Sequence, residues 1–418
     1  MENKVLIVDF GSQYTQLIAR RIRELFIFCE IYPYNNLPKK LLDYKAVVFS
    51  GSPYSVYQED SPNIDLEKFI GKIPVLAICY GAQFIANNQK GKVENSNSRE
   101  YGRARLTYID NESILFNGIS KDNQVWMSHG DTIVELPEDA KLIASTESVE
   151  NAAYSLNEKK VFGLQFHPEV FHTDNGLKIF ENFFLHILKF NQDWTPKSFI
   201  QDSIKEIKTT VKNDKVILGI SGGVDSTVAA VLLNNAIGDN LNCVFVNNGL
   251  LRKDEFKEVL AQYENMGLNV VGVDASKEFI SGLRGITDPE QKRKVIGSIF
   301  IDVFENQSKK IQDAKWLAQG TIYPDVIESI SVKGPSSTIK SHHNVGGIPE
   351  KMNLKIIEPL KMLFKDEVRR IGESLDIDKN ILNRHPFPGP GLGIRILGEV
   401  DEESIRLVQE ADKIYIDS

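Results

Sequence analysis

The sequence is poor in cysteine, and this scarcity excludes two classes of stabilised protein. Three cysteines, Cys29, Cys79 and Cys243, stand far apart among 418 residues. Such spacing makes neither a disulfide framework nor a C-x-x-C metal site. Because cytoplasmic proteins keep their thiols reduced, this cysteine usage indicates a cytoplasmic protein.

Long apolar runs and an excess of basic residues are also missing. No apolar segment approaches the roughly 20 residues that span a bilayer. The opening residues, MENKVLIVDFGSQ, lack a signal-peptide pattern because their short apolar run ends at Asp9. The formal net charge of −8 argues against binding nucleic acid across a whole surface, although it permits small basic pockets. We therefore expect neither a membrane nor a nucleic-acid partner.

Short apolar runs alternate with helical patterns along two parts of the chain, which is typical of parallel α/β sheets. Strands are predicted at residues 4–10, 46–51, 74–79, 215–221, 241–247 and 269–275. Helices are predicted at residues 14–25, 176–189, 226–235, 255–266, 289–306 and 364–375. The part between residues 93 and 170 reads as shorter strands with frequent turns.

The fold class that follows is α/β, with two doubly wound, mostly parallel sheets in two domains, residues 1–190 and 191–384. Thr195 resembles an N-cap and Pro196 a first helical residue, so a new helix begins just after this boundary. Residues 385–418 read as the start of a third domain, because a helix-like tail ends on the last residue.

Cys79 ends the predicted strand of PVLAICYGAQ and is followed at once by Tyr80-Gly81. A free cysteine in such a place is often only a buried thiol. The same position also suits a nucleophile on a sharp strand-to-helix turn, where the helix N-terminus stabilises a thiolate and supplies N–H groups to an oxyanion.

A general base for that nucleophile is offered by His167, which closes the strand-like run KVFGLQFHPEV. Glu169 follows at i+2, so both side chains point to the same side of an extended segment. The carboxylate can then orient the imidazole, as in a Cys-His-acid triad. The alternative is a capping or core histidine beside a surface glutamate.

Together, C-Y-G-A-Q and the downstream F-H-P-E resemble the class I glutamine amidotransferases, and DFGSQYTQLIARRIRE and WMSHGD resemble the glutaminase domain of the GMP synthetase family. The resemblance implies that Cys79 attacks the glutamine amide, that His167 acts as base and then acid, and that Glu169 orients it. It also implies that the backbone N–H groups of Tyr80 and of the SGSP turn at Ser52 hold the oxyanion. Gln83 would help to hold the substrate glutamine.

One departure from the family lies in that turn, where this chain has Gly51-Ser52 and the family usually has two glycines. Because a backbone donor does not need the second glycine, we expect the oxyanion hole to be retained.

The segment KVILGISGGVDST predicts a phosphate-binding loop between a strand and a helix. Glycines let the backbone approach a phosphate closely, and the loop N–H groups and helix N-terminus attract an anion. An aspartate in such a loop opposes an anion unless it faces a metal, so Mg²⁺ is expected. Neither a Walker A pattern nor G-x-G-x-x-G is present. The loop residues expected to bind ATP are Ser221, Gly222, Gly223, Val224, Asp225, Ser226 and Thr227.

This loop resembles that of the N-type ATP pyrophosphatases, which split ATP into AMP and pyrophosphate. Three further stretches supply candidate ligands. The basic run around Arg293 includes Arg284, Lys292 and Lys294 and reads either as a solvated helix face or as a phosphate contact. Asp325 and Glu328 share a helix face and, with Asp225, are candidate Mg²⁺ ligands. Lys340, His342 and His343, in a glycine-rich segment, are candidates for a lid and, with Arg293, for contacts to XMP.

These blocks, with RHPFPGPGLGIRILGE at 384–399, are similar to the GMP synthetase family along almost the whole chain. The resemblance implies the conversion of XMP, ATP, glutamine and water into GMP, AMP, pyrophosphate and glutamate. It also implies a homodimer for full-length members. Asn247 departs from the family, which often has aspartate there.

Two other functions are weighed against this one. Synthetases for NAD or asparagine also adenylate an acceptor, but they carry other glutaminases, one of them with a cysteine exposed directly after the first Met; here Glu2 follows Met1. A regulator with an inactive glutaminase is disfavoured by the intact Cys79, His167 and Glu169.

The end of the chain at Ser418 carries an expectation of its own. The family has a C-terminal domain whose last segment, rich in Lys-Pro-Pro and ending in Trp-Glu, binds XMP. Because the sequence lacks that segment, we expect it to keep the glutaminase fold and the ATP loop without closing a full XMP site.

Overall fold

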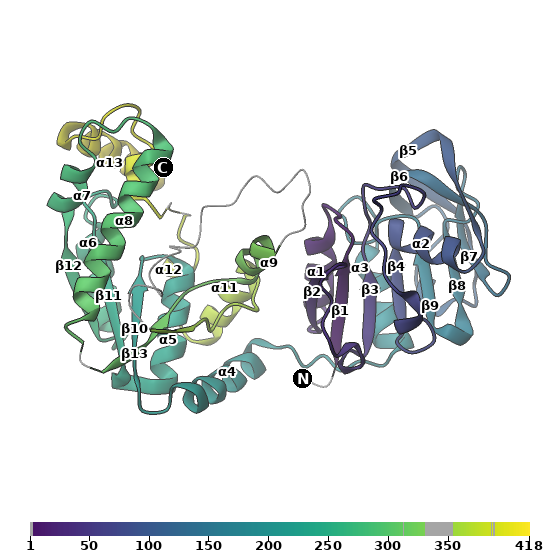
Figure 1. The fold of residues 1–418 in the computed structure, drawn as a ribbon, viewed down its shortest axis with the longest axis horizontal. Coiled ribbons are helices and arrows are strands. Elements are labelled where there is room, and N and C mark those ends of the chain that lie inside the picture. Colours follow the sequence, from purple (N-terminus) through teal and green to yellow (C-terminus); the bar gives the residue numbers. More distant parts are fainter. Residues whose placement is uncertain (1–2, 312, 331–353, 386, 388) are drawn as a thin grey trace. The chain divides into compact units, whose positions relative to one another are not determined.

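The computed structural model describes residues 3–311, 313–330, 354–385, 387 and 389–418 (Figure 1). Lys340, His342 and His343 lie outside the described residues. The chain divides into two compact units, with the break between Thr195 and Pro196. The predicted α/β class is confirmed, since each unit is built around a sheet that contains parallel strands. In the described ranges no helix is long and apolar enough to cross a membrane.

The first unit contains a nine-stranded mixed sheet. One half is parallel and almost fully buried, as expected for strands covered on both faces. The other half, formed by the region of shorter predicted strands, is antiparallel. In spatial order the strands are β2 (Phe28–Pro33), β1 (Lys4–Asp9), β3 (Ala46–Phe49), β4 (Val75–Ile78), β9 (Val161–Leu164), β8 (Ala153–Leu156), β7 (Lys141–Thr146), β5 (Lys92–Ile109) and β6 (Gln124–Glu135).

Three helical segments of the first unit accompany this sheet. They are α1 (Thr15–Glu24), α2 (Tyr80–Asn88) and α3 (Gly176–Glu181), the last continued by a π-helical segment, Asn182–Ile187. Near the end of the unit, the Trp194 indole packs on Phe28 with ring centroids 4.7 Å apart, and the Trp194 backbone N–H donates to the carbonyl of Phe26.

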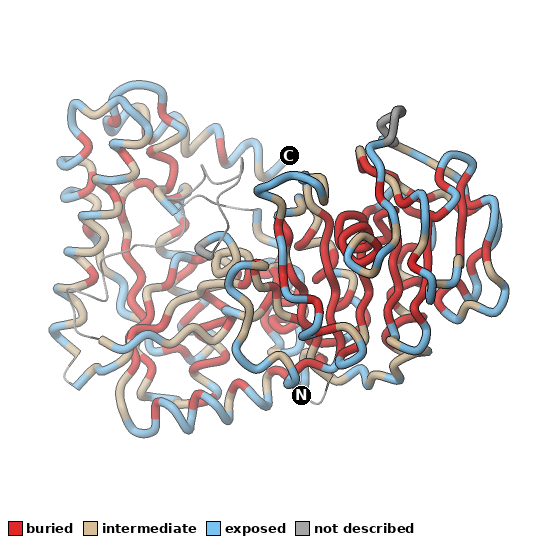
Figure 2. Tube along the Cα trace, turned by 45° about the vertical axis from the view of Figure 1, so that its right-hand side comes forward, coloured by how far each residue is buried: buried red, intermediate tan, exposed pale blue. Residues whose placement is uncertain are grey.

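The second unit contains a five-stranded sheet that is parallel throughout the described residues. In spatial order its strands are β12 (Val270–Asp274), β11 (Leu241–Asn247), β10 (Lys215–Ile220), β13 (Ala314–Ala318) and β14 (Lys355–Ile357). Buried residues concentrate along the parallel strands of the first sheet and along β10 and β11 of the second (Figure 2).

Helices accompany the second sheet, and those between consecutive strands form the crossovers that parallel pairing requires. The first of them begins at Pro196, the position expected from the sequence. They are α4 (Pro196–Val211), α5 (Val224–Ile237), α6 (Glu255–Asn265), α7 (Ser276–Gly282), α8 (Pro289–Ser308), α9 (Tyr323–Ile330), α11 (Lys365–Ser374), α12 (Lys379–Leu382) and α13 (Glu402–Asp417).

Residues 385–418 were predicted to begin a third domain, and of these, residues 389–418 pack on the core of the second unit. The N–H of Leu392 donates to the carbonyl of Leu250 at 2.7 Å. Ile396, Val400 and Ile405 join the apolar cluster that surrounds β11 and α8.

One side chain, Tyr154, joins the first sheet to the helix that follows Cys79. Its ring crosses from β8 over Gly163 of β9, and its hydroxyl donates to the carbonyl of Ala82 in α2 at 2.7 Å. A Cβ on Gly163 would come within 2.3 Å of the Tyr154 ring. The missing side chain at position 163 therefore lets Tyr154 join the sheet to α2.

We predict that Gly163→Ala destabilises the first unit by about 1–3 kcal/mol, because the fully buried ring has no free space into which it can move. The change should lower the thermal midpoint by about 2–4 °C per kcal/mol, measured by differential scanning calorimetry. Gly130→Ala in β6 is the matched control, since a Cβ there meets nothing within 4 Å. Equal midpoints for the two variants would contradict this packing argument.

Candidate active sites

Cys79 lies on a sharp turn between β4 and α2. Its φ is 51° and its ψ −110°, a region that costs a non-glycine residue about 1–3 kcal/mol. Hydrogen bonds on both sides hold it there: its N–H donates to the carbonyl of Leu164 at 2.7 Å, and its own carbonyl accepts from the N–H of Gln83 at 3.0 Å. The turn presents the side chain at the carboxyl end of a parallel strand, where ligands bind in such sheets.

The helix that follows Cys79 lies unusually close to the neighbouring strand. A Cβ on Gly81 would fall 2.7 Å from Cβ and 3.0 Å from the carbonyl oxygen of Phe49 in β3. Glycine at this position therefore allows α2 to begin directly after the cysteine, so that its unpaired N–H groups start next to the thiol.

His167 and Glu169 make the predicted contact, but they lie in a turn after β9, which ends at Leu164, and not on the extended segment that was expected. Nδ1 of His167 lies 2.7 Å from Oε1 of Glu169, and both side chains are buried. Burial disfavours the charged imidazole, but the charges of Glu169 and Cys79 outweigh it and raise the pKa of His167 well above its ordinary value. The other ring nitrogen, Nε2, is buried without a hydrogen-bond partner among the described residues.

The cysteine and the histidine face one space, above Gly51. A Cβ built on Gly51 would lie 3.2 Å from Cε1 of His167 and 3.5 Å from Cβ of Cys79. The Cys79 thiol is directed toward the carbonyl of Ser128 at 3.8 Å. The structure thus brings Cys79, His167 and Glu169 together, and a small residue at position 51 keeps the gap between thiol and imidazole open.

Ser50 fixes the backbone of the SGSP turn. Its hydroxyl accepts from the N–H of Phe10 and donates to the carbonyl of Gly51, each at 2.9 Å. Because the N–H of a trans peptide points away from its carbonyl, this bond sets the direction of the Ser52 N–H. Tyr80, the other expected oxyanion donor, is the first residue of α2, and its side-chain hydroxyl donates to the carbonyl of Pro62 at 2.6 Å.

Gln83 is engaged with protein groups. Its amide nitrogen donates to the carbonyl of Asp131 at 2.6 Å and to Oε1 of Gln165 at 3.3 Å. A direct contact of Gln83 with glutamine stays a prediction. Nearby, burial and the charge of His167 lower the pKa of His129 to about 4, so this second histidine is neutral at neutral pH.

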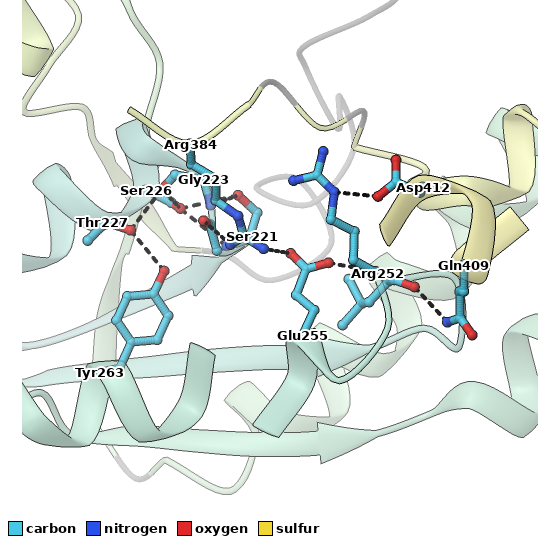
Figure 3. Close-up of polar contacts among 12 residues, drawn as sticks. Ser221, Gly223, Ser226, Thr227, Arg252, Glu255, Tyr263, Arg384, Gln409 and Asp412 are labelled. Atoms are coloured by element: carbon cyan, nitrogen blue, oxygen red, sulfur yellow. Dashed lines mark hydrogen bonds and ion pairs between the residues drawn. The ribbon is translucent and has the colours of Figure 1, made fainter. Parts of the chain in front are cut away.

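The glycine-rich loop of the second unit joins β10 to α5 as expected. Gly222 has a φ of 73°, and α5 begins at Val224. The hydroxyls of Ser226 and Thr227 donate to the carbonyl of Gly223 at 3.0 and 2.8 Å, and Ser226 Oγ accepts from the N–H of Ser221 at 3.2 Å (Figure 3). These hydroxyls close the loop on itself.

The three candidate metal ligands do not form one cluster. Asp225 is paired through both oxygens with Nζ of Lys365, at 2.7 Å each. Asp325 accepts from the N–H of Ile322 at the start of α9, and Glu328 is exposed. No group of three or more acidic, histidine or cysteine side chains suited to a metal ion occurs in the described part of the chain.

The basic residues of α8 do not form one exposed patch. Lys292 is fully buried and donates to the carbonyls of Ile396 at 2.7 Å and Gly393 at 3.4 Å, and burial lowers its pKa. It holds the C-terminal segment and does not face a phosphate, contrary to the phosphate-contact interpretation of this run. Arg293 is partly exposed and pairs with Glu290 at 3.3 Å.

The sequence motifs indicated no role for Arg384, although this residue begins the segment RHPFPGPGLGIRILGE. Its guanidinium donates to the carbonyl of Gly222 at 2.8 Å and pairs with Glu255. The available signal was an arginine directly before the proline-rich sequence HPFPGPG, without any indication of its partner.

The class of protein follows from comparison with family models. The model of glutamine amidotransferase class-I matches residues 6–187, and that of NAD synthase matches residues 197–294. The chain therefore joins a glutamine amidotransferase to a unit of the NAD synthase type.

Relatives that match both units define the particular family. A GMP synthase [glutamine-hydrolyzing] of Christiangramia forsetii is 60% identical over 416 residues, and one of Flavobacterium psychrophilum is 58% identical, each match covering 100% of this chain and 82% of the relative. The crystal structure of a GMP synthase subunit from Thermoplasma acidophilum is 30% identical, with a TM-score of 0.40, and covers 46% of this chain and 99% of that one. The chain belongs to the glutamine-hydrolysing GMP synthase family.

We predict that Glu169→Gln lowers the pKa of His167, because burial then acts without the opposing carboxylate. Titration of selectively labelled histidine rings by NMR measures this pKa, with His167→Asn to identify the signal. Glu181→Gln is the matched control, since Glu181 lies 3.4 Å from the partly exposed His186. An unchanged His167 titration in Glu169→Gln would show that the carboxylate does not control the imidazole.

Proposed function

We propose that this glutamine-dependent GMP synthase divides its reaction between the two sites described above. The overall reaction converts XMP, ATP, glutamine and water into GMP, AMP, pyrophosphate and glutamate. The first unit releases ammonia from glutamine, and the second activates XMP with ATP. The relatives match across both units, which favours this acceptor over those of NAD and asparagine synthetases.

In the first unit, Cys79 is the proposed nucleophile. His167 takes the thiol proton through Nε2, and the thiolate attacks the side-chain amide of glutamine. The tetrahedral oxyanion is stabilised by N–H groups of Tyr80 and Ser52. His167 then protonates the leaving ammonia, and water hydrolyses the thioester to glutamate. Glu169 keeps the imidazole oriented and stabilises its positive charge.

The observation that carries this proposal is the strained cysteine beside a buried His–Glu pair. A cysteine with a φ of 51° is costly, and a structural thiol does not need that conformation. The 2.7 Å contact between His167 and Glu169 leaves Nε2 as the ring nitrogen available to the thiol. The strained backbone of Cys79, the base His167 and the orienting acid Glu169 therefore lie together around the sulfur atom of Cys79.

In the second unit, the proposed role of the SGGVDST loop is to bind the phosphates of ATP. The oxygen at position 2 of the xanthine ring attacks the α-phosphate, and pyrophosphate leaves. Ammonia then displaces AMP from the adenylated ring to give GMP. Arg293, Lys340, His342 and His343 stay the candidates for XMP and the lid.

Mg²⁺ is the proposed cofactor, and the residues fit one mode of binding it. Mg²⁺ commonly keeps several waters and takes one or two carboxylates plus substrate phosphates. Asp225, at the start of α5, is suited to be such a carboxylate, while Asp325 and Glu328 stay weaker candidates. The ion would neutralise phosphate charge during adenylation.

A homodimer and a cytoplasmic location complete the proposal. The three cysteines are free, which fits a reducing compartment. The dimer rests on the family resemblance, and analytical ultracentrifugation of the chain measures it.

We predict that Cys79→Ala lowers glutamate release at least a thousandfold, on the order seen when a nucleophile is removed. The variant should still bind ATP as the wild type does, because the loop lies in the other unit. Cys29→Ala is the control, since that buried thiol contacts the carbonyl of Ala19 and lies outside the proposed site. Undiminished glutamate release by Cys79→Ala would refute the assignment of the nucleophile.

We predict that Asp225→Asn weakens ATP binding in the presence of Mg²⁺ about tenfold, because an amide is a poorer Mg²⁺ ligand than a carboxylate. In EDTA, binding should be unchanged or tighter, since Lys365 loses its partner. Isothermal titration calorimetry measures both, and Asp366→Asn, which removes a surface pair with Arg370, is the control. Loss of the same size with and without Mg²⁺ would exclude Asp225 as a metal ligand.

A further inference from the structure

Arg384 reaches the phosphate-type loop from a distant part of the chain. It follows α12, 162 residues after Gly222, and its Nη1 donates to the Gly222 carbonyl at 2.8 Å. Its Nη2 pairs with Oε1 of Glu255, the first residue of α6 (Figure 3). One guanidinium thus bridges the loop and a helix that begins beside it.

Glu255 holds that guanidinium in place. Its side chain is 2% exposed, and its two oxygens have different partners: Oε1 faces Arg384, and Oε2 accepts from the N–H of Arg252 at 2.7 Å. A buried carboxylate is tolerated only when it is paired and hydrogen-bonded in this way. The Arg384 side chain therefore has its orientation set by a buried, fully engaged acid.

The contact acts on the peptide between Gly222 and Gly223. Arg384 binds its carbonyl, so the N–H of Gly223 must point to the opposite side of the trans peptide. This N–H has one long contact, to Ser221 Oγ at 3.4 Å. Anion-binding loops need such N–H groups turned outward together.

Gly222 has no room for a side chain at this contact. With a φ of 73°, it adopts a conformation that disfavours other residues. A Cβ there would also lie 3.0 Å from Nη1 of Arg384 and 3.5 Å from Oε1 of Glu255. The absence of a side chain at Gly222 therefore allows Arg384 to reach the carbonyl of this residue.

We propose that Arg384, oriented by Glu255, is a positioning residue for ATP: it holds the Gly222–Gly223 peptide so that the Gly223 N–H faces the phosphates. The inference rests on the proposed role of the SGGVDST loop. It differs from a direct phosphate contact, because here the guanidinium acts through the backbone. It also differs from a staple for the segment after residue 384, which would affect stability and leave ATP affinity unchanged.

The test compares ATP affinity, by calorimetry with excess Mg²⁺, among Arg384→Met, Arg384→Lys and the wild type. Methionine should weaken ATP binding tenfold or more, because a charge-assisted hydrogen bond to the loop is lost. Lysine should recover part of the affinity, since it can donate to the carbonyl but cannot also bind Glu255 in the same geometry. Arg369→Met is the matched control, because that arginine donates to the Leu382 carbonyl in the same unit.

A second variant separates positioning from direct contact. Glu255→Gln should weaken ATP binding, because the guanidinium loses its fixed orientation. If Arg384 contacts phosphate directly, the variant would bind ATP as well as or better than the wild type, and the positioning role would be overturned. Thermal unfolding shows whether Glu255→Gln folds; if it does not, the comparison of methionine with lysine at position 384 decides.

Failure of the inference and failure of the proposed function give different results. Wild-type ATP affinity in Arg384→Met, together with weakened affinity in Ser226→Ala, would reject the role of Arg384 and keep that of the loop. Wild-type affinity in both variants would reject the loop assignment itself. Thermal unfolding of each variant verifies its fold.

Discussion

Both sites depend on a chain reversal in which a buried parallel strand passes directly into a helix. The reversal requires a positive φ at the turn, 51° at Cys79 and 73° at Gly222. In the second unit the turn needs only its backbone, so glycine adopts this conformation without strain. In the first unit the turn residue is Cys79, whose side chain makes this conformation strained. The hydrogen bonds to Leu164 and Gln83 hold the backbone there.

The two units also share a way of directing main-chain N–H groups. Ser50 binds the carbonyl of Gly51 at 2.9 Å, and Arg384 binds the carbonyl of Gly222 at 2.8 Å. In each case the peptide is fixed by its carbonyl, so the next N–H is directed without any strong bond of its own. The neutral hydroxyl suits a site for a transient oxyanion, whereas the guanidinium lies beside a loop suited to phosphates.

The features that depend on residues close together in the sequence could be predicted from the sequence alone. The Cys79 turn follows from a strand, Tyr80 and Gly81. The contact of His167 with Glu169 was also predicted, although a turn brings the two side chains together and not the extended segment that was expected. Most of the parallel strands were predicted within a few residues, but β2, β13 and β14 were not. The apolar residues of β2 merge with those after α1.

Contacts between distant residues were not predictable in this way. The pairs Arg384–Glu255 and Lys365–Asp225 join residues 129 and 140 positions apart. Lys292 carried the same sequence signal as its exposed neighbours, yet it faces two carbonyls of the core. The sequence shows where a basic residue occurs, but only the fold shows whether its charged group is already paired or hydrogen-bonded within the protein.

The two proposed sites differ in how their charged side chains are paired. In the proposed reaction the first site handles a substrate that is neutral at its amide, and it places Cys79 beside the buried pair of His167 and Glu169. ATP carries several negative charges, yet two cations near the loop are already engaged: Arg384 with Glu255, and Lys365 with Asp225. Because these two cations are paired with carboxylates, the proposed phosphate binding gives weight to the backbone N–H groups of the loop, and therefore to the direction of the Gly223 N–H.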